Sequence, residues 1–95
     1  TVRLIVLNGP LANQQIPLSK RMRLGREEDN DLTLPDPKVS RYHALIKWQE
    51  EQYQITDLGS SNGTYVNRER ITEPTSLKNG DAIILGETEL TFSDQ

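Results

Sequence analysis

The sequence predicts an all-β fold, a small sandwich or barrel built from short strands. Apolar and polar residues alternate with a period of two along most of the chain. Turn-forming Gly, Pro, Asn and Asp residues interrupt this alternation at short intervals. No segment keeps the 3.6-residue period of an amphipathic helix, so little or no helix is expected.

Four strands are predicted in the first half of the chain. The first is almost entirely apolar and ends at the turn Asn8-Gly9-Pro10. The second contains Pro17, which indicates the edge of a sheet because proline has no N–H to donate. The polar loop 27–30 separates the third strand from the fourth, and Pro35-Asp36-Pro37 ends the fourth. These strands are expected at residues 2–7, 15–18, 22–26 and 31–34.

The second half of the chain is predicted to form hairpins. Glu50-Glu51 lies between two alternating segments, and Asn62-Gly63 is a turn signal because both residues tolerate positive φ. Asn79-Gly80 leads into the last two strands. These strands are expected at residues 43–48, 52–58, 64–67, 70–71, 82–86 and 89–93. The whole chain therefore has about ten short strands.

Composition excludes several classes of protein. The chain has 95 residues, no cysteine and one histidine, so we expect a single domain at 1–95 without disulfides, a metal site or a cofactor. The net charge of −3 argues against nucleic-acid binding, and no apolar stretch is long enough to insert into a membrane. We expect a cytoplasmic protein, monomeric as an isolated domain. Because strand pattern begins at Val2 without a preceding Met, we expect a module excised from a longer, multidomain protein.

Motifs for catalysis and nucleotide binding are missing, so we expect no enzyme. The sequence has neither a G-x-x-x-x-G-K-[ST] nor a G-x-G-x-x-G motif. Ser40 and His43 are three residues apart on a loop that enters a strand, which is poor geometry for a nucleophile and its base. Asp36, Asp57 and Asp81 are interpreted as turn and hydrogen-bonding residues.

Polar residues gather in three loops that each follow or precede a predicted strand. The loops are 25–26, 38–41 and 59–63, and together they offer guanidinium groups, hydroxyl groups and backbone N–H groups. A dianionic phosphate needs such a set of charged and neutral donors. Most of the basic residues fall in one segment, Lys20, Arg21, Arg23, Arg26, Lys38, Arg41 and Lys47. Residue by residue, solvated arginines and ordinary turns are the more common explanation of such loops.

Five motifs in order resemble the forkhead-associated (FHA) domain across almost the whole chain, from about residue 2 to 93. They are GR (25–26), NDLTL (30–34), VSRYHA (39–44), DLGSSNGTYVN (57–67) and LKNGD (77–81). The resemblance implies an eleven-stranded, antiparallel-type β-sandwich whose loops at one apex bind phosphothreonine peptides. It implies a signalling or regulatory docking module whose partner is a phosphothreonine-containing protein, in trans or in cis.

The resemblance also implies roles for the residues of the motifs. Arg26 would grip the phosphate, Ser40 would donate a hydroxyl to it, and Arg41 would assist. Ser61 would lie near the phosphate and the threonine methyl group, and Asn62 would hydrogen-bond the peptide backbone.

Other positions are implied to be structural or to affect selectivity. Gly25 and Gly63 would permit the turns, and His43 would brace the binding loops. Lys38 would influence recognition of the third residue after the phosphothreonine, with a preference for an acidic residue. Two departures stand out: Tyr42 replaces a common basic residue, and Asn67-Arg68 replaces an Asn-Gly turn, for which a wider turn is expected. A different reading remains open, a scaffold domain that binds a partner through a sheet face without phosphate.

Overall fold

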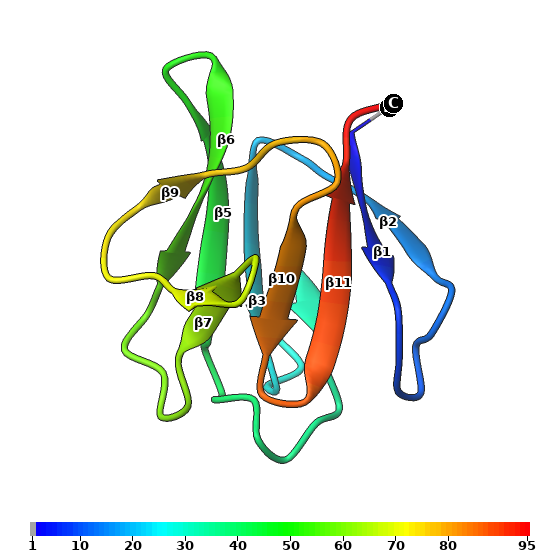
Figure 1. Cartoon of the computed structure of the whole chain (residues 1–95). Coiled ribbons are helices and arrows are strands. Elements are labelled where there is room, and N and C mark those ends of the chain that lie inside the picture. Colours follow the sequence, from blue (N-terminus) through cyan, green and yellow to red (C-terminus); the bar gives the residue numbers. More distant parts are fainter. Residues whose placement is uncertain (1) are drawn as a thin grey trace.

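The computed structural model describes residues 2–95, which form a sandwich of two β-sheets without a helix (Figure 1). Residues 2–95 contain eleven strands, which confirms the fold that the sequence and the resemblance predict. The strands are β1 (Arg3–Val6), β2 (Gln15–Pro17), β3 (Arg21–Gly25), β4 (Leu32–Thr33), β5 (Ala44–Gln49), β6 (Gln52–Asp57), β7 (Thr64–Val66), β8 (Glu69–Arg70), β9 (Thr75–Ser76), β10 (Ala82–Leu85) and β11 (Thr88–Ser93).

One sheet has six strands and the other has five among the described residues. The first has the order β2-β1-β11-β10-β7-β8, and the second has the order β4-β3-β5-β6-β9. Neighbouring strands are antiparallel, except that β4 runs parallel to β3, with Leu32 opposite Leu24. The antiparallel-type expectation is therefore correct for every pair but this one. A parallel pair arises because the loop 26–31 returns the chain along β3 before β4 begins.

The hydrophobic core lies between the two sheets. Alternate residues of the strands point inward: Leu4 and Val6 of β1 are buried, whereas Arg3 and Ile5 are partly exposed. The same pattern recurs in the opposite sheet, where Met22 is buried. The buried apolar side chains are Leu4, Val6, Met22, Leu24, Leu32, Leu34, Val39, Ala44, Ile46, Ile55, Val66, Leu77, Ile83, Leu85, Leu90 and Phe92. Each strand therefore keeps one wet face, as its alternation predicts.

The structure agrees with some of the local predictions and differs from others. Pro17 lies in the edge strand β2, as predicted. The wider turn expected at Asn67-Arg68 is wrong, because Val66 pairs directly with Glu69. Both turn residues adopt positive φ, 51° and 71°, which closes a two-residue hairpin without glycine. Strand β9 was not predicted, because its two polar residues carry no alternation.

The two ends of the sandwich differ. The start of β1, the C-terminus and the β5–β6 hairpin lie at one end, and the loops β3–β4, β4–β5 and β6–β7 lie at the other (Figure 1). Arg3 pairs with Ser93, and its side chain donates a hydrogen bond to the carbonyl oxygen of Gln95. Within residues 2–95 no helix has the length and apolar character required to cross a bilayer.

Candidate functional site

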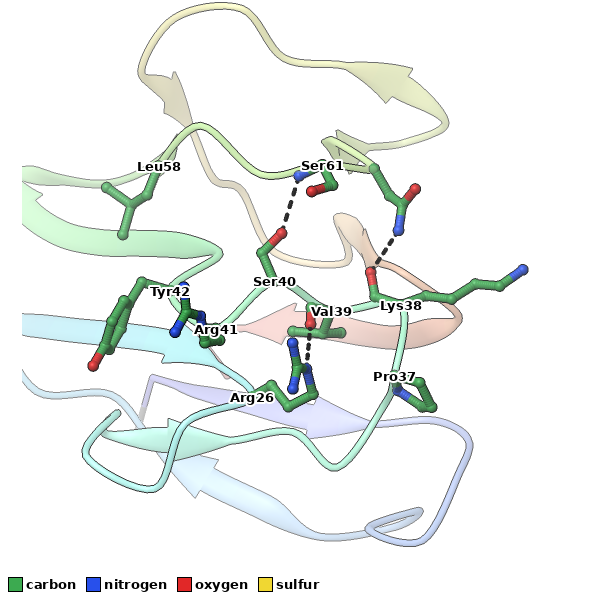
Figure 2. Close-up of a pocket in the computed structure, with 10 residues that line it drawn as sticks. Arg26, Pro37, Lys38, Val39, Ser40, Arg41, Tyr42, Leu58 and Ser61 are labelled. Atoms are coloured by element: carbon green, nitrogen blue, oxygen red, sulfur yellow. Dashed lines mark hydrogen bonds between the residues drawn. The ribbon is translucent and has the colours of Figure 1, made fainter.

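The loops β3–β4, β4–β5 and β6–β7 enclose an open groove of about 390 Å³ at one end of the sandwich (Figure 2). It contains each residue expected to bind the phosphopeptide, and also Lys38. The lining residues are Arg26, Pro37, Lys38, Val39, Ser40, Arg41, Tyr42, Leu58, Ser61 and Asn62. Gly25, His43 and Gly63 do not line the groove and are buried. The structure therefore divides the predicted residues into a groove surface and its support.

Arg26 follows the last residue of β3 and is held at the base of the groove. Its backbone N–H donates to the carbonyl oxygen of Ser40 at 3.1 Å, and its Nε donates to that of Val39 at 3.0 Å (Figure 2). Among residues 2–95, no group hydrogen-bonds to its terminal nitrogens. The side chain of Arg41 is exposed and likewise has no partner in the described chain. The groove thus offers two guanidinium groups with unused donors.

Ser40 joins two of the loops. Its Oγ accepts a hydrogen bond from the backbone N–H of Ser61 at 3.0 Å (Figure 2). Because Oγ accepts in this bond, its own proton is available to a ligand. Asn62 makes a second link, since its Nδ2 donates to the carbonyl oxygen of Lys38 at 2.8 Å. The β4–β5 and β6–β7 loops are therefore preformed as one surface.

His43 lies beneath this surface and is completely buried. Its Nδ1 accepts a hydrogen bond from the backbone N–H of Ser40 at 3.0 Å, and its Nε2 lies 2.8 Å from the carbonyl oxygen of Gly63. Since Nδ1 accepts, the proton sits on Nε2, which donates to Gly63. The neutral ring therefore holds the β4–β5 loop to the β6–β7 loop.

The two glycines permit close approaches between the loops. A Cβ on Gly25 would lie 2.2 Å from the carbonyl oxygen of Arg41 and 2.8 Å from Nδ2 of Asn30. Gly63 adopts a φ of 86°, and a Cβ there would lie 2.7 Å from Nε of Arg70. A larger residue at Gly25 would displace the backbone of Arg41, whereas a larger residue at Gly63 would meet the side chain of Arg70 in a strained, left-handed backbone conformation.

Lys38 stands at the rim of the groove with an acidic neighbour. Its Nζ lies 3.9 Å from Oε2 of Glu87, and both side chains are largely exposed. An exposed pair at this distance stabilises the protein little. The ammonium group of Lys38 can therefore leave Glu87 at little energetic cost and bind another carboxylate.

Two carboxylates support the loops, the partly buried Asp57 and the buried Asp36, and the sequence assigned them only general hydrogen-bonding roles. Asp57 ends β6 and holds the β6–β7 loop: its Oδ1 accepts from Ser60 Oγ at 2.5 Å and from Thr64 Oγ1 at 2.7 Å. Its Oδ2 accepts from the backbone N–H groups of Gly59 and Ser60, both at 3.0 Å. Burial by itself raises the pKa of Asp57, but these four hydrogen bonds outweigh it and lower the pKa below its ordinary value.

Asp36 anchors the β4–β5 loop to the β10–β11 hairpin. Its Oδ1 accepts from the backbone N–H of Lys38, and its Oδ2 accepts from the N–H of Glu87 and from Thr88 Oγ1. Burial raises the pKa of Asp36, but the hydrogen bonds again outweigh it and lower the pKa. The segment that carries Ser40 is thus fixed at both ends.

The lowered pKa values predict acid sensitivity of the loops. Because the folded pKa of Asp57 lies below the ordinary 3.8, its contribution to stability is complete above that value and is lost as the pH falls through the folded pKa. We expect the free energy of unfolding, measured with urea, to fall progressively below about pH 4. Asp57→Asn should be less stable at pH 7 and less dependent on pH, whereas Glu28→Gln, at an exposed loop position, should follow the wild type. Equal pH dependence of Asp57→Asn and wild type would contradict this account.

Sequence reasoning missed some groove and supporting residues. Leu58 and Tyr42 line the groove, although no chemical motif marked them as contact residues. Asn30 is buried beneath Gly25 and donates from Nδ2 to the carbonyl oxygens of Glu27 and Arg41. A polar residue in a loop carries no signal of burial in a single sequence, so only the three-dimensional structure reveals this role.

Comparison with known proteins agrees with this architecture. The oxoglutarate dehydrogenase inhibitor of Corynebacterium jeikeium is 42% identical over 90 residues, which cover 94% of this chain and 62% of the relative. The chain thus spans less than two thirds of that protein. The solved structure of Mycobacterium tuberculosis EmbR in complex with a low affinity phosphopeptide has a TM-score of 0.88 and 38% identity, and the match covers 97% of this chain and 24% of EmbR.

A second solved structure covers nearly the same length of chain. It comes from a structural and functional analysis of phosphothreonine-dependent FHA domain interactions and has a TM-score of 0.86 and 33% identity. The match covers 99% of this chain and 96% of that one. The family model of the FHA domain matches residues 22–86, which include all three groove loops. This chain therefore belongs to the FHA domain family.

Proposed function

We propose that this chain is a phosphopeptide-binding module that recognises phosphothreonine in partner proteins, in trans or in cis, for signalling or regulatory docking. One observation carries the proposal: Arg26 and Arg41 bring guanidinium groups whose terminal nitrogens have no hydrogen-bond partner within residues 2–95 to the same groove as the hydroxyl of Ser40. A phosphate dianion accepts several charge-assisted hydrogen bonds at once, which this set supplies. The family relationship, with relatives described in complex with a phosphopeptide, supports the same proposal.

Each groove residue has a distinct part in the proposal. Arg26 grips the phosphate, Ser40 donates its free hydroxyl proton, and Arg41 assists from the exposed side. Ser61 lies beside Ser40 and faces the phosphate and the threonine methyl group. The side-chain amide of Asn62 uses one N–H to bond the carbonyl oxygen of Lys38. Its second N–H and its amide oxygen are therefore available to the peptide backbone.

We also propose that the domain has no catalytic activity of its own. Both ring nitrogens of His43 bond to backbone atoms, so the ring is unavailable as a general base. Ser40 Oγ instead accepts from the backbone of Ser61. We propose further that the domain works inside the cell as one module of a longer protein. EmbR is an example of such an arrangement, because the match with this chain covers only 24% of EmbR.

A titration with three matched peptides tests the proposed function. The same peptide is prepared with phosphothreonine, phosphoserine or unmodified threonine, and its affinity is measured by fluorescence polarisation. We expect phosphothreonine to bind most tightly, and its affinity to fall below about pH 6, where the phosphate loses its second charge. Equal affinity for all three peptides would rule out the proposal.

A further inference from the structure

Two exposed apolar side chains lie at one end of the groove, where the proposed phosphate chemistry does not use them. Tyr42 is 41% exposed and Leu58 is 40% exposed, and both line the groove. Figure 2 shows them at the end that also carries Arg41, with Lys38 at the opposite end and Ser40 between. One end of the groove therefore carries two apolar side chains beside Arg41, and the other end carries Lys38.

Tyr42 is held in place by its neighbours. The guanidinium carbon of Arg23 lies 4.4 Å from the centre of its ring, and its hydroxyl donates to Oδ2 of Asp29 at 3.0 Å. The hydrogen bond to Asp29 also raises the pKa of Tyr42, so the phenol remains protonated. A ring fixed in this way loses little conformational entropy when a ligand covers it.

Leu58 is fixed through its backbone. Its N–H donates to the carbonyl oxygen of His43 at 2.9 Å, directly after the end of β6. The next residues are held by Asp57. Leu58 therefore projects from a rigid position, and its exposed apolar surface would leave water if a peptide side chain covered it.

The exposure of this pair is unusual for the molecule. Among residues 2–95, the large hydrophobic side chains that are exposed are Leu7, Tyr42, Trp48 and Leu58. Two of the four line the same groove. Exposed apolar groups that gather beside polar contacts are typical of recognition surfaces.

We propose that Tyr42 and Leu58 form a specificity subsite that takes an apolar side chain on the N-terminal side of the phosphothreonine. This inference rests on the proposed function and on the role that the FHA resemblance implies for Lys38, with which the residues after the phosphothreonine lie at the Lys38 end. The residues before it then lie at the opposite end. An extended peptide advances about 3.3 Å per residue, so the three residues before the phosphothreonine extend over about 10 Å of this end of the groove.

A positional series of phosphothreonine peptides tests the subsite. Each of the three positions before and the three positions after the phosphothreonine carries Leu or Ala in turn, and affinity is measured by fluorescence polarisation. We expect Leu at one preceding position to bind roughly three- to tenfold more tightly than Ala. Leu58→Asn should remove this difference. Leu7→Asn is the matched control, because Leu7 is 46% exposed and lies outside the groove, and it should preserve the difference.

A second variant reverses the chemistry of the subsite. Leu58→Arg should make Glu the preferred residue at the same peptide position, while the requirement for phosphothreonine stays unchanged. Three results would overturn the subsite alone: no preference before the phosphothreonine, a preference that survives Leu58→Asn, or an acidic preference in the wild type that Arg41→Ala removes. Failure of the wild type to bind any phosphothreonine peptide would instead overturn the proposed function.

Discussion

Replacement of Arg26 by alanine is expected to weaken phosphothreonine-peptide binding by about 2–5 kcal/mol, which is roughly 30-fold to 5,000-fold. Arg26 is the guanidinium that Val39 fixes at the base of the groove. Without it, the bound phosphate keeps its cost of desolvation but loses its best-placed positive charge. Fluorescence polarisation or calorimetry with one phosphothreonine peptide measures the loss.

The matched control for this experiment is Arg21→Ala. Arg21 is the first residue of β3, the strand that Arg26 directly follows, and is exposed, but it does not line the groove. Its removal changes the net charge equally and should leave affinity nearly unchanged at physiological salt. If Arg26→Ala kept full binding to a natural partner, recognition through a sheet face without phosphate would be the better interpretation.

Replacement of His43 by alanine is expected to lower the free energy of unfolding by about 3–5 kcal/mol. The change leaves a buried cavity and removes the partners of the Ser40 N–H and the Gly63 carbonyl oxygen. Because small domains have only about 5–15 kcal/mol of stability, the loss is a large fraction of the total. Urea unfolding followed by the fluorescence of the single tryptophan, Trp48, measures it.

A control and a second measurement separate packing from loop positioning. Lys47→Ala changes an exposed residue of β5 and should unfold at nearly the urea concentration of the wild type. In conditions where His43→Ala is still folded, its affinity for phosphopeptide should also fall, because His43 no longer joins the two groove loops. Unchanged stability of His43→Ala would show that the buried hydrogen bonds are dispensable.

Much of the fold could be predicted because burial imposes a period of two on each long strand. The alternation of Met22 and Leu24 with Arg23 is visible in the sequence, and in β3 Met22 and Leu24 are buried whereas Arg23 is partly exposed. Strand β9 escaped prediction because its position depends on pairing with β6, where Thr75 lies opposite Ile55, and not on its own two residues. A strand defined only by its neighbour leaves no local pattern.

The candidate site likewise contains residues that local motifs predict and residues that depend on contacts between distant parts of the chain. Arg26 and Ser40 belong to short motifs that a sequence displays directly. Leu58 and Tyr42 are distant in sequence and line the same groove because the backbone N–H of Leu58 bonds to the carbonyl oxygen of His43, the residue after Tyr42. The supporting bonds of Asp36 extend over 51 and 52 residues to Glu87 and Thr88, a separation that no local motif encodes.

The position of the chain ends restricts how this domain engages a phosphothreonine in its own polypeptide. Arg3 pairs with Ser93 at the end of the sandwich away from the groove (Figure 1). The molecule measures 32 × 28 × 25 Å, so a tether that spans only its shortest dimension needs about eight fully extended residues. A phosphothreonine closer to the domain than this cannot reach the groove of its own molecule and can bind only the groove of another. A phosphothreonine on a longer tether can reach its own groove, where its high local concentration favours it over phosphopeptides of other molecules.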